Sequence, residues 1–262
     1  MRFSVNLSTI FTEVPFLDRF KKAKEAGFQY VECQFPYDYA IEEIEAKLRE
    51  NKLSMTLINC PAGNWEAGDR GLAVDKKREA EFKMAVEQSI AYAKRLKVER
   101  IHCMAGIVPQ ACLYEEAKKT YIKNMAYAAK KMAEHGLVLL IEPINAIDMP
   151  GYFLSSLHDA LNIIDEMNLP NVKLQYDFYH VQKMHGDLLS NFQQHLHTIG
   201  HVQIADCPGR HEPGTGEIHY GNIFQHIQSS SYAGYVGLEY FPKARSEDSF
   251  SWLGSSREGA SL

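Results

Sequence analysis

Four hydrophilic side chains stand within or at the end of short apolar runs in the second half of the chain: Glu142 in Ile141-Glu142-Pro143, Asp177 in Tyr176-Asp177-Phe178, Gln203 in Val202-Gln203-Ile204 and Glu239 in Leu238-Glu239-Tyr240. A polar group placed in apolar surroundings costs free energy unless it is paired or bound. Three carboxylates brought together would repel one another, and a divalent cation would remove that repulsion. Because all four donors are oxygens, we expect a hard ion, Mg²⁺ or Mn²⁺, rather than zinc.

The simpler explanation is that each side chain meets solvent or caps the next helix. For a single residue that explanation is the commoner one. For a set of four on successive apolar runs it is the weaker one, because all four would have to be incidental. The set therefore indicates a metal site formed by Glu142, Asp177, Gln203 and Glu239.

Three further side chains are candidates for binding a substrate. His180 follows Asp177 by three residues, where it can reach a ligand or hydrogen-bond a metal-bound carboxylate. Arg210 lies in the segment 206–217, which is rich in Gly, Pro and charge, and a guanidinium can clamp a carboxylate with two hydrogen bonds. Trp65 can supply an aromatic wall. The alternatives are an exposed loop arginine and a tryptophan that packs within its own loop.

The elements that must position these side chains alternate between apolar runs and amphipathic stretches. Strands are predicted over residues 3–7, 28–34, 53–60, 101–104, 137–141, 172–177, 199–205 and 235–239. Helical spacing of apolar residues lies between them, with Gly27 and Gly136 as expected helix stops. Eight such units in 262 residues match a single closed (β/α)8 barrel, whose active site lies at the carboxyl ends of the strands. A doubly wound open sheet is disfavoured, because its Gly-rich phosphate turn is missing after the first strand.

Composition and charge exclude several classes of protein. Hydrophobic residues make up 45% and charged residues 23%, which rules out a mainly disordered or fibrous chain. The net charge of −5 offers no basic surplus for nucleic acid. The scattered cysteines contain no CxxC pair, which is typical of free thiols in a reducing compartment. With neither a signal peptide nor an apolar segment of roughly 20 residues, we expect a cytoplasmic protein without membrane contact.

The domain organisation is predicted to be simple. No linker rich in Pro, Gly or Ser divides the chain, so we expect one barrel domain over residues 1–262. The polar, Ser-rich segment 243–262 is expected to form one short helix and a frayed tail. The sequence gives no indication of the oligomeric state.

On these motifs the chain resembles the hydroxypyruvate isomerase family, within the xylose-isomerase-like barrel superfamily that also holds ketose 3-epimerases and endonuclease IV. The resemblance covers essentially the whole chain except its last few residues. Gln203 stands where the sugar epimerases usually carry a histidine, which favours the hydroxypyruvate isomerase branch. The motifs that carry the resemblance are the segment 200–218, Ile141-Glu142-Pro143-Ile144-Asn145, Tyr176-Asp177 with His180, and Gly237-Leu238-Glu239-Tyr240.

The resemblance implies that Glu142, Asp177, Gln203 and Glu239 bind the metal and that Glu142 and Glu239 also transfer protons. It implies interconversion of hydroxypyruvate and 2-hydroxy-3-oxopropanoate (tartronate semialdehyde) through an enediolate, with His180 and Arg210 holding this small-molecule substrate. Two alternatives use the same site: turnover of a longer 2-oxo acid or ketose, and metal-dependent binding of a sugar acid without turnover. Two opposed carboxylate bases argue against pure binding, and the charge of −5 argues against a nuclease.

Overall fold

The computed structural model describes residues 1–110 and 112–256. Its centre is a closed barrel in which each strand pairs in parallel with the next one along the chain and the last pairs with the first. The predicted (β/α)8 barrel is confirmed, and most strands are slightly shorter than predicted. The strands are β1 (Phe3–Asn6), β2 (Tyr30–Cys33), β3 (Ser54–Asn59), β4 (Arg100–His102), β5 (Val138–Ile141), β6 (Val172–Asp177), β7 (Ile199–Ile204) and β8 (Val236–Leu238).

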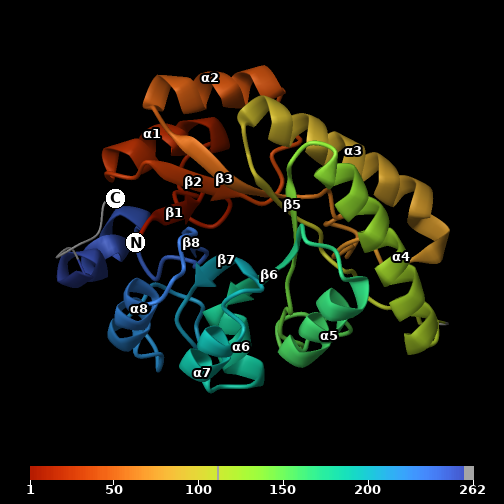
Figure 1. Cartoon of the computed structure of the whole chain (residues 1–262). Helices are drawn as coiled ribbons and strands as arrows, with labels where there is room; N and C mark the ends of the chain where they lie inside the picture. The colour runs from red at the N-terminus through yellow and green to blue at the C-terminus, as the bar shows by residue number, and fades with distance from the viewer. Residues whose placement is uncertain (111, 257–262) are drawn as a thin grey trace.

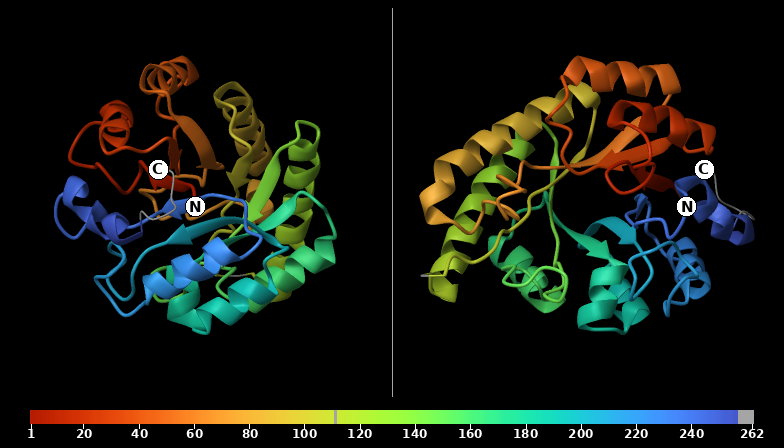
Figure 2. Two further views of the ribbon diagram at one scale, coloured as in Figure 1. Left: turned by 60° about the vertical axis from the view of Figure 1, so that its left-hand side comes forward. Right: turned by 180° about the vertical axis from the view of Figure 1, so that it is seen from behind.

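Helices follow the strands and surround the barrel (Figures 1 and 2). Gly27 (φ 94°) after α1 and Gly136 (φ 68°) after α4 end their helices as predicted. The C-cap of helix α2 is Lys52, which has a positive φ of 54°. The helices are α1 (Phe16–Glu25), α2 (Ile41–Asn51), α3 (Glu79–Leu96), α4 (Tyr114–Ala133), α5 (Leu157–Met167), α6 (Phe178–Met184), α7 (Leu188–Gln194) and α8 (Tyr220–Ser229), with 3₁₀ segments η1 (Lys76–Arg78) and η2 (Ser246–Ser256).

Apolar helix faces cover the outside of the barrel and form most of the core. Helix α4 buries Tyr121, Met125, Ala128 and Met132 completely, as the helical spacing predicts. Removing each large apolar side chain from water contributes about 1.5–3 kcal/mol. Apolar packing from outside therefore stabilises the barrel whose strand ends carry the candidate site.

The inside of the barrel is polar. Along β1 the buried side chains alternate, with Ser4 and Asn6 between apolar neighbours. Glu32 on β2 accepts a hydrogen bond from Gln203 on β7 at 2.8 Å, and Nε2 of His201 on β7 lies 3.0 Å from the same carboxylate. Because β2 and β7 are not neighbours in the sheet, these side chains meet across the barrel interior. A buried polar layer of this kind specifies one arrangement of the strands.

The C-terminal segment packs beside the N-terminal strand. The rings of Phe3 and Trp252 lie 5.5 Å apart, and the Ser246 hydroxyl accepts a hydrogen bond from the Phe11 backbone N–H at 2.7 Å. The expected short helix in 243–262 is present as η2, whereas the expected tail at 257–262 lies outside the described residues. Within residues 1–110 and 112–256, no helix combines the length and the apolar character that a membrane crossing requires.

Candidate active site

The four predicted oxygen donors all lie at the carboxyl-terminal rim of the barrel. Glu142 directly follows β5, Asp177 ends β6, Gln203 lies one residue before the end of β7 and Glu239 directly follows β8. Each keeps at most 5% of its surface exposed. The barrel thus places the four side chains at one rim, where the sequence predicted them, and their binding of a metal stays a prediction.

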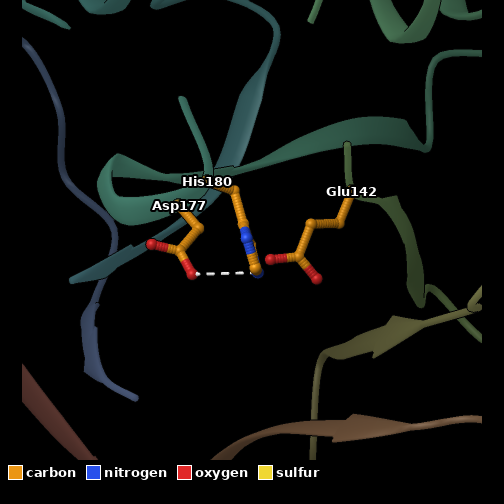
Figure 3. A group of neighbouring side chains, drawn as sticks. All are labelled: Glu142, Asp177 and His180. Atoms are coloured by element: carbon orange, nitrogen blue, oxygen red, sulfur yellow. Dashed lines mark ion pairs between the residues drawn. The ribbon is translucent and has the colours of Figure 1, made fainter. Parts of the chain in front are cut away.

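Glu142, Asp177 and His180 form a close group (Figure 3). One oxygen of each carboxylate and one ring nitrogen of His180 lie within 4.8 Å of one another. Asp177 is also the N-cap of α6, because its Oδ1 accepts the Tyr179 backbone N–H at 2.8 Å. Its Oδ2 is buried, lies 3.6 Å from Nε2 of His180, and accepts no hydrogen bond from the part of the chain that the structure describes. By position alone, this group could hold a metal ion.

Arg210 reaches into the same group from the loop after β7. Its guanidinium donates to Oε2 of Glu239 at 2.6 Å and lies 3.8 Å from Oδ2 of Asp177. Oε1 of Glu239 accepts from Asn6 and Gln34, each at 3.0 Å. The Glu239 carboxylate is therefore held by three donors from three different parts of the chain, which fixes its position.

The loop that presents Arg210 is organised by the buried carboxylate of Asp206. Both of its oxygens accept backbone N–H groups, which holds the loop to the end of β7. Gly216 has no room for a side chain, since a Cβ there would lie 2.0 Å from the Cys207 carbonyl oxygen. The four donors to Asp206, at 2.8–3.0 Å, are the backbone N–H groups of Cys207, Gly214, Gly216 and Ile218.

Gln203 is tied into the polar interior of the barrel. Its Nε2 donates to Glu32 at 2.8 Å, and its Oε1 accepts from Gln175 at 2.7 Å. A carbonyl oxygen has two lone pairs, so one on Gln203 is still available to a ligand. Gly237 on β8 makes room for this layer, because a Cβ there would lie 2.5 Å from a carboxylate oxygen of Glu32.

The electrostatics of the group are unbalanced. Burial, followed by the charges of Glu239 and Asp177, raises the pKa of Glu142 well above its usual range. Burial raises the pKa of Asp177 to about 7 against the opposing charge of Arg210. Burial also raises the pKa of Glu239, again against Arg210. A single guanidinium therefore does not offset three buried carboxylates.

This imbalance, together with the free Oδ2 of Asp177, fits a bound cation. The oxygen donors match a hard ion. Glu142 and Asp177 are available to it, and Oε1 of Gln203 has one lone pair left beside the bond from Gln175, whereas Oε2 of Glu239 is engaged by Arg210. A cation at this rim would therefore share Glu239 with Arg210.

A cavity of about 330 Å³ opens beside the group. Its wall includes Glu142, His180, Arg210 and Glu239, whereas Asp177 and Gln203 are not among the described residues of that wall. Trp65 also lines it, 38% exposed, with its ring 5.5 Å from Phe35. The structure thus brings all three predicted substrate-binding side chains to one cavity.

His102 is a residue of the cavity that the sequence analysis did not single out. It ends β4, is 1% exposed, and its Nδ1 lies 3.5 Å from Oε2 of Glu142. Burial lowers its pKa to about 3, so the ring is neutral at physiological pH. The signal that identified Glu142, a polar residue at the end of an apolar run, is also present at His102 and could have found it.

Comparisons with known proteins place the chain among barrel enzymes. Residues 20–256 match the family model described as xylose isomerase-like TIM barrel. The chain is 46% identical over 253 residues to the hydroxypyruvate isomerase of Escherichia coli (strain K12), covering 97% of this chain and 98% of that one. It is 42% identical over 252 residues to a 2-oxo-tetronate isomerase of Cupriavidus necator, covering 96% and 97%.

A solved structure agrees with the described fold. The crystal structure of a protein described as AP endonuclease, family 2, from Brucella melitensis superposes with a TM-score of 0.94. It is 42% identical, and the match covers 98% of this chain and 99% of that one.

Proposed function

Because the chain belongs to the xylose isomerase-like TIM barrel family, we propose that it interconverts hydroxypyruvate and 2-hydroxy-3-oxopropanoate at the Glu142–Glu239 rim. Its relatives named hydroxypyruvate isomerase and 2-oxo-tetronate isomerase support an isomerase of small oxo acids. The observation that carries the specific reaction is the pair of buried carboxylates, Glu142 and Glu239, which come from β5 and β8 and line one cavity that also contains Arg210.

Hydroxypyruvate carries a carboxylate, a ketone at C2 and a hydroxymethyl group at C3. Among the described residues of the cavity wall, Arg210 is the one permanently charged cation, and it would hold the substrate carboxylate. His180 lines the same wall and would bind a substrate oxygen. Trp65 and Phe35 would pack on the carbon chain and restrict water.

The reaction moves a hydrogen from C3 to C2. One of Glu142 and Glu239 removes the C3 proton, and the electron pair forms the C2–C3 double bond of an enediolate while the ketone oxygen gains negative charge. That residue or its opposite then returns a proton at C2, and the proton of the C3 hydroxyl passes to the C2 oxygen, so that C3 becomes the aldehyde and C2 the carbinol. Burial of both carboxylates would limit exchange of the carried proton with bulk water.

A divalent ion, Mg²⁺ or Mn²⁺, would be held by Glu142 and Asp177 with Gln203 and Glu239. When bound, it would polarise the ketone and stabilise developing negative charge on oxygen. The fit rests on the excess of buried carboxylates over cations and on the hydrogen-bond-free Oδ2 of Asp177 in the described chain.

A four-carbon 2-oxo acid is the second candidate substrate. One relative that is 42% identical is named a 2-oxo-tetronate isomerase. The cavity of about 330 Å³ has room for a substrate longer than three carbons. Both substrates present the same carboxylate, ketone and neighbouring carbinol, so the same side chains would act on either.

The test is turnover by purified, chelator-treated protein, with and without Mg²⁺ or Mn²⁺, using hydroxypyruvate and 2-oxo-tetronate in parallel. Metal-dependent formation of tartronate semialdehyde that disappears in Glu142→Gln and Glu239→Gln supports the proposal. Glu134→Gln is the matched control, because this glutamate is 57% exposed at the end of α4. Normal activity in either site variant contradicts the assigned roles. Turnover of the four-carbon acid alone selects the second candidate, and binding without turnover selects a binding protein.

A further inference from the structure

We propose that Asn145 is a positioning residue that fixes the His180 ring in the tautomer with its proton on Nε2, so that His180 donates a hydrogen bond in the site and does not ligate a metal ion. The kinetic consequence rests on the proposed function, whereas the tautomer itself does not. Both residues are buried: Asn145 is 0% and His180 3% exposed.

Two N–H groups of Asn145 meet the same ring nitrogen. The backbone N lies 3.4 Å from Nδ1 of His180, and the side-chain Nδ2 lies 2.7 Å from it. A backbone N–H can only donate, and it cannot be reversed by turning a side chain. Nδ1 is therefore the acceptor, which a ring protonated at that nitrogen could not be.

The orientation of the Asn145 amide is fixed independently of the histidine. Its Oδ1 accepts the backbone N–H of Asp148 at 2.8 Å, and its Nδ2 donates to Oδ2 of Asp148 at 2.9 Å. Turning the amide over would place the NH₂ group against an N–H donor and the oxygen against a carboxylate. Asp148 is itself held by Lys183 and by the Tyr179 hydroxyl, each at 2.6 Å.

A neutral imidazole carries one proton, so an acceptor at Nδ1 puts that proton on Nε2. Nε2 lies 3.6 Å from Oδ2 of Asp177, on the side of the ring that faces the two carboxylates in Figure 3. Metal ligation requires the lone pair of that nitrogen, which the proton occupies. The three side chains of this group thus have different roles. The carboxylates of Glu142 and Asp177 are available to a cation, and His180 donates a hydrogen bond to an oxygen of the substrate.

The test exchanges the amide of Asn145 and the carboxylate of Asp148, which are hydrogen-bonded to each other. The double variant Asn145→Asp/Asp148→Asn keeps the net charge and one amide beside one carboxylate, but it presents a carboxylate to Nδ1. Asp148→Asn alone is the matched control, because Asn145 still donates to the ring. The tautomer is read from the ¹⁵N chemical shifts of the His180 ring in ¹⁵N-histidine-labelled protein without metal or substrate, with His180→Gln assigning the signals.

We expect the Nε2–H signature in the wild type and in Asp148→Asn, and a shift toward Nδ1–H in the double variant. A ring with its proton on Nδ1 loses the hydrogen bond from Nε2 to the substrate oxygen, so we expect the double variant to lose about 10- to 100-fold in kcat/KM relative to Asp148→Asn. An Nδ1–H ring in the wild type would overturn the proposal. An unchanged tautomer in the double variant would also overturn it, because the tautomer would then be set by the backbone N–H of residue 145, which the variant keeps, and not by the Asn145 side chain. Because the spectra need no turnover, they remain decisive even if hydroxypyruvate is not the substrate.

Discussion

Arg210 and Glu239 form an ion pair at the rim of the barrel, in which the guanidinium lies 2.6 Å from Oε2 of Glu239 and 3.8 Å from Oδ2 of Asp177. One guanidinium is therefore shared by two buried acids from different strands. A divalent ion bound by the same acids would take over part of that neutralising role. If the proposed ion binds these acids, its binding would be coupled to the position of Arg210.

Replacing Arg210 by Met should make the fold depend on a divalent ion. Without metal, loss of the partner of a buried carboxylate costs about 3–5 kcal/mol, and we expect about 2–3 kcal/mol here because the Arg210 side chain is 21% exposed. Added Mg²⁺ or Mn²⁺ should raise the Tm of Arg210→Met by more than it raises the Tm of the wild type. Calorimetry in chelator and in metal measures both effects.

The control for this measurement is Arg245→Met. Arg245 forms an ion pair with Glu247 on the surface and is 74% exposed, so the variant should respond to metal as the wild type does. Equal metal-induced shifts in wild type and Arg210→Met would show that Arg210 and the ion do not share the carboxylates.

Trp65→Ala should weaken substrate binding and leave the chemical step unchanged. Trp65 lines the cavity but touches neither Glu142 nor Glu239 through any hydrogen bond, and Arg70 stacks on its ring at 4.0 Å. We expect KM to rise about five- to tenfold, or ~1–1.4 kcal/mol, with kcat unchanged, as for an interaction made equally in ground and transition states. A fall in kcat with an unchanged KM would assign Trp65 to a different role.

Trp65 also offers a direct measure of binding. The chain contains 2 tryptophans, and the other, Trp252, packs on Phe3 and Phe224 beside the N-terminal strand. In Trp252→Phe the fluorescence comes from Trp65 alone. Titration with the substrate should change that signal, and an unchanged signal at saturating substrate would place the ligand away from Trp65.

The fold and the rim of the site were predictable because their signals are local. Each strand reads as a short apolar run, and Glu142, Asp177 and Glu239 interrupt or end such runs. Parallel strands in a barrel bring those ends together without further information. The same reasoning reaches His102, which ends β4.

The polar interior of the barrel was not predicted, because its contacts join residues far apart in the chain. Glu32 and Gln203 are 171 positions apart, and the spacing of either one says nothing about the other. The orientation of Arg210 toward Glu239 depends on the loop held by Asp206, whose partners are backbone groups that any sequence possesses. Such contacts depend on the three-dimensional arrangement of the strands, so they can be found only in the structure.

Gly237→Ala should destabilise the barrel and disturb Gln203 through Glu32. A Cβ at position 237 would lie 2.5 and 2.6 Å from the two carboxylate oxygens of Glu32, which is 0% exposed. Overpacking of this kind costs about 1–3 kcal/mol, and we expect a loss in the upper part of that range. Urea unfolding of the variant, compared with Gly254→Ala, measures it, since a Cβ at Gly254 meets nothing within 4 Å.

The double variant Gly237→Ala/Glu32→Asp tests whether a clash with Glu32 causes the loss of stability in Gly237→Ala. The shorter aspartate withdraws its carboxylate from the added methyl group, so it should recover part of the stability that Gly237→Ala alone loses. Glu32→Asp by itself should destabilise, because it lengthens the hydrogen bond from Gln203. Simple additivity of the two losses would show that the clash is not with Glu32.

Asp148 should make the stability of the protein depend on pH in the acid range. Burial alone would raise the pKa of Asp148, but hydrogen bonds from Lys183, Tyr179 and Asn145 outweigh it and lower the pKa to about 2. A carboxyl group whose pKa is lower in the folded state stabilises the fold above its unfolded pKa of about 3.9. That contribution is lost as the pH falls from about 4 to about 2.

Asp148→Asn removes this contribution at every pH. Because the Asp148 side chain is 35% exposed, screening by solvent reduces its worth, and we expect the variant to be less stable by about 1 kcal/mol at about pH 6. The difference between wild type and variant should then close as the pH falls to about 2, where Asp148 of the folded wild type is itself becoming protonated. Urea unfolding of both proteins across this range measures the difference, with Asp165→Asn on the exposed face of α5 as control. A difference that stays constant down to about pH 2 would show that the hydrogen bonds to Asp148 do not depend on its charge.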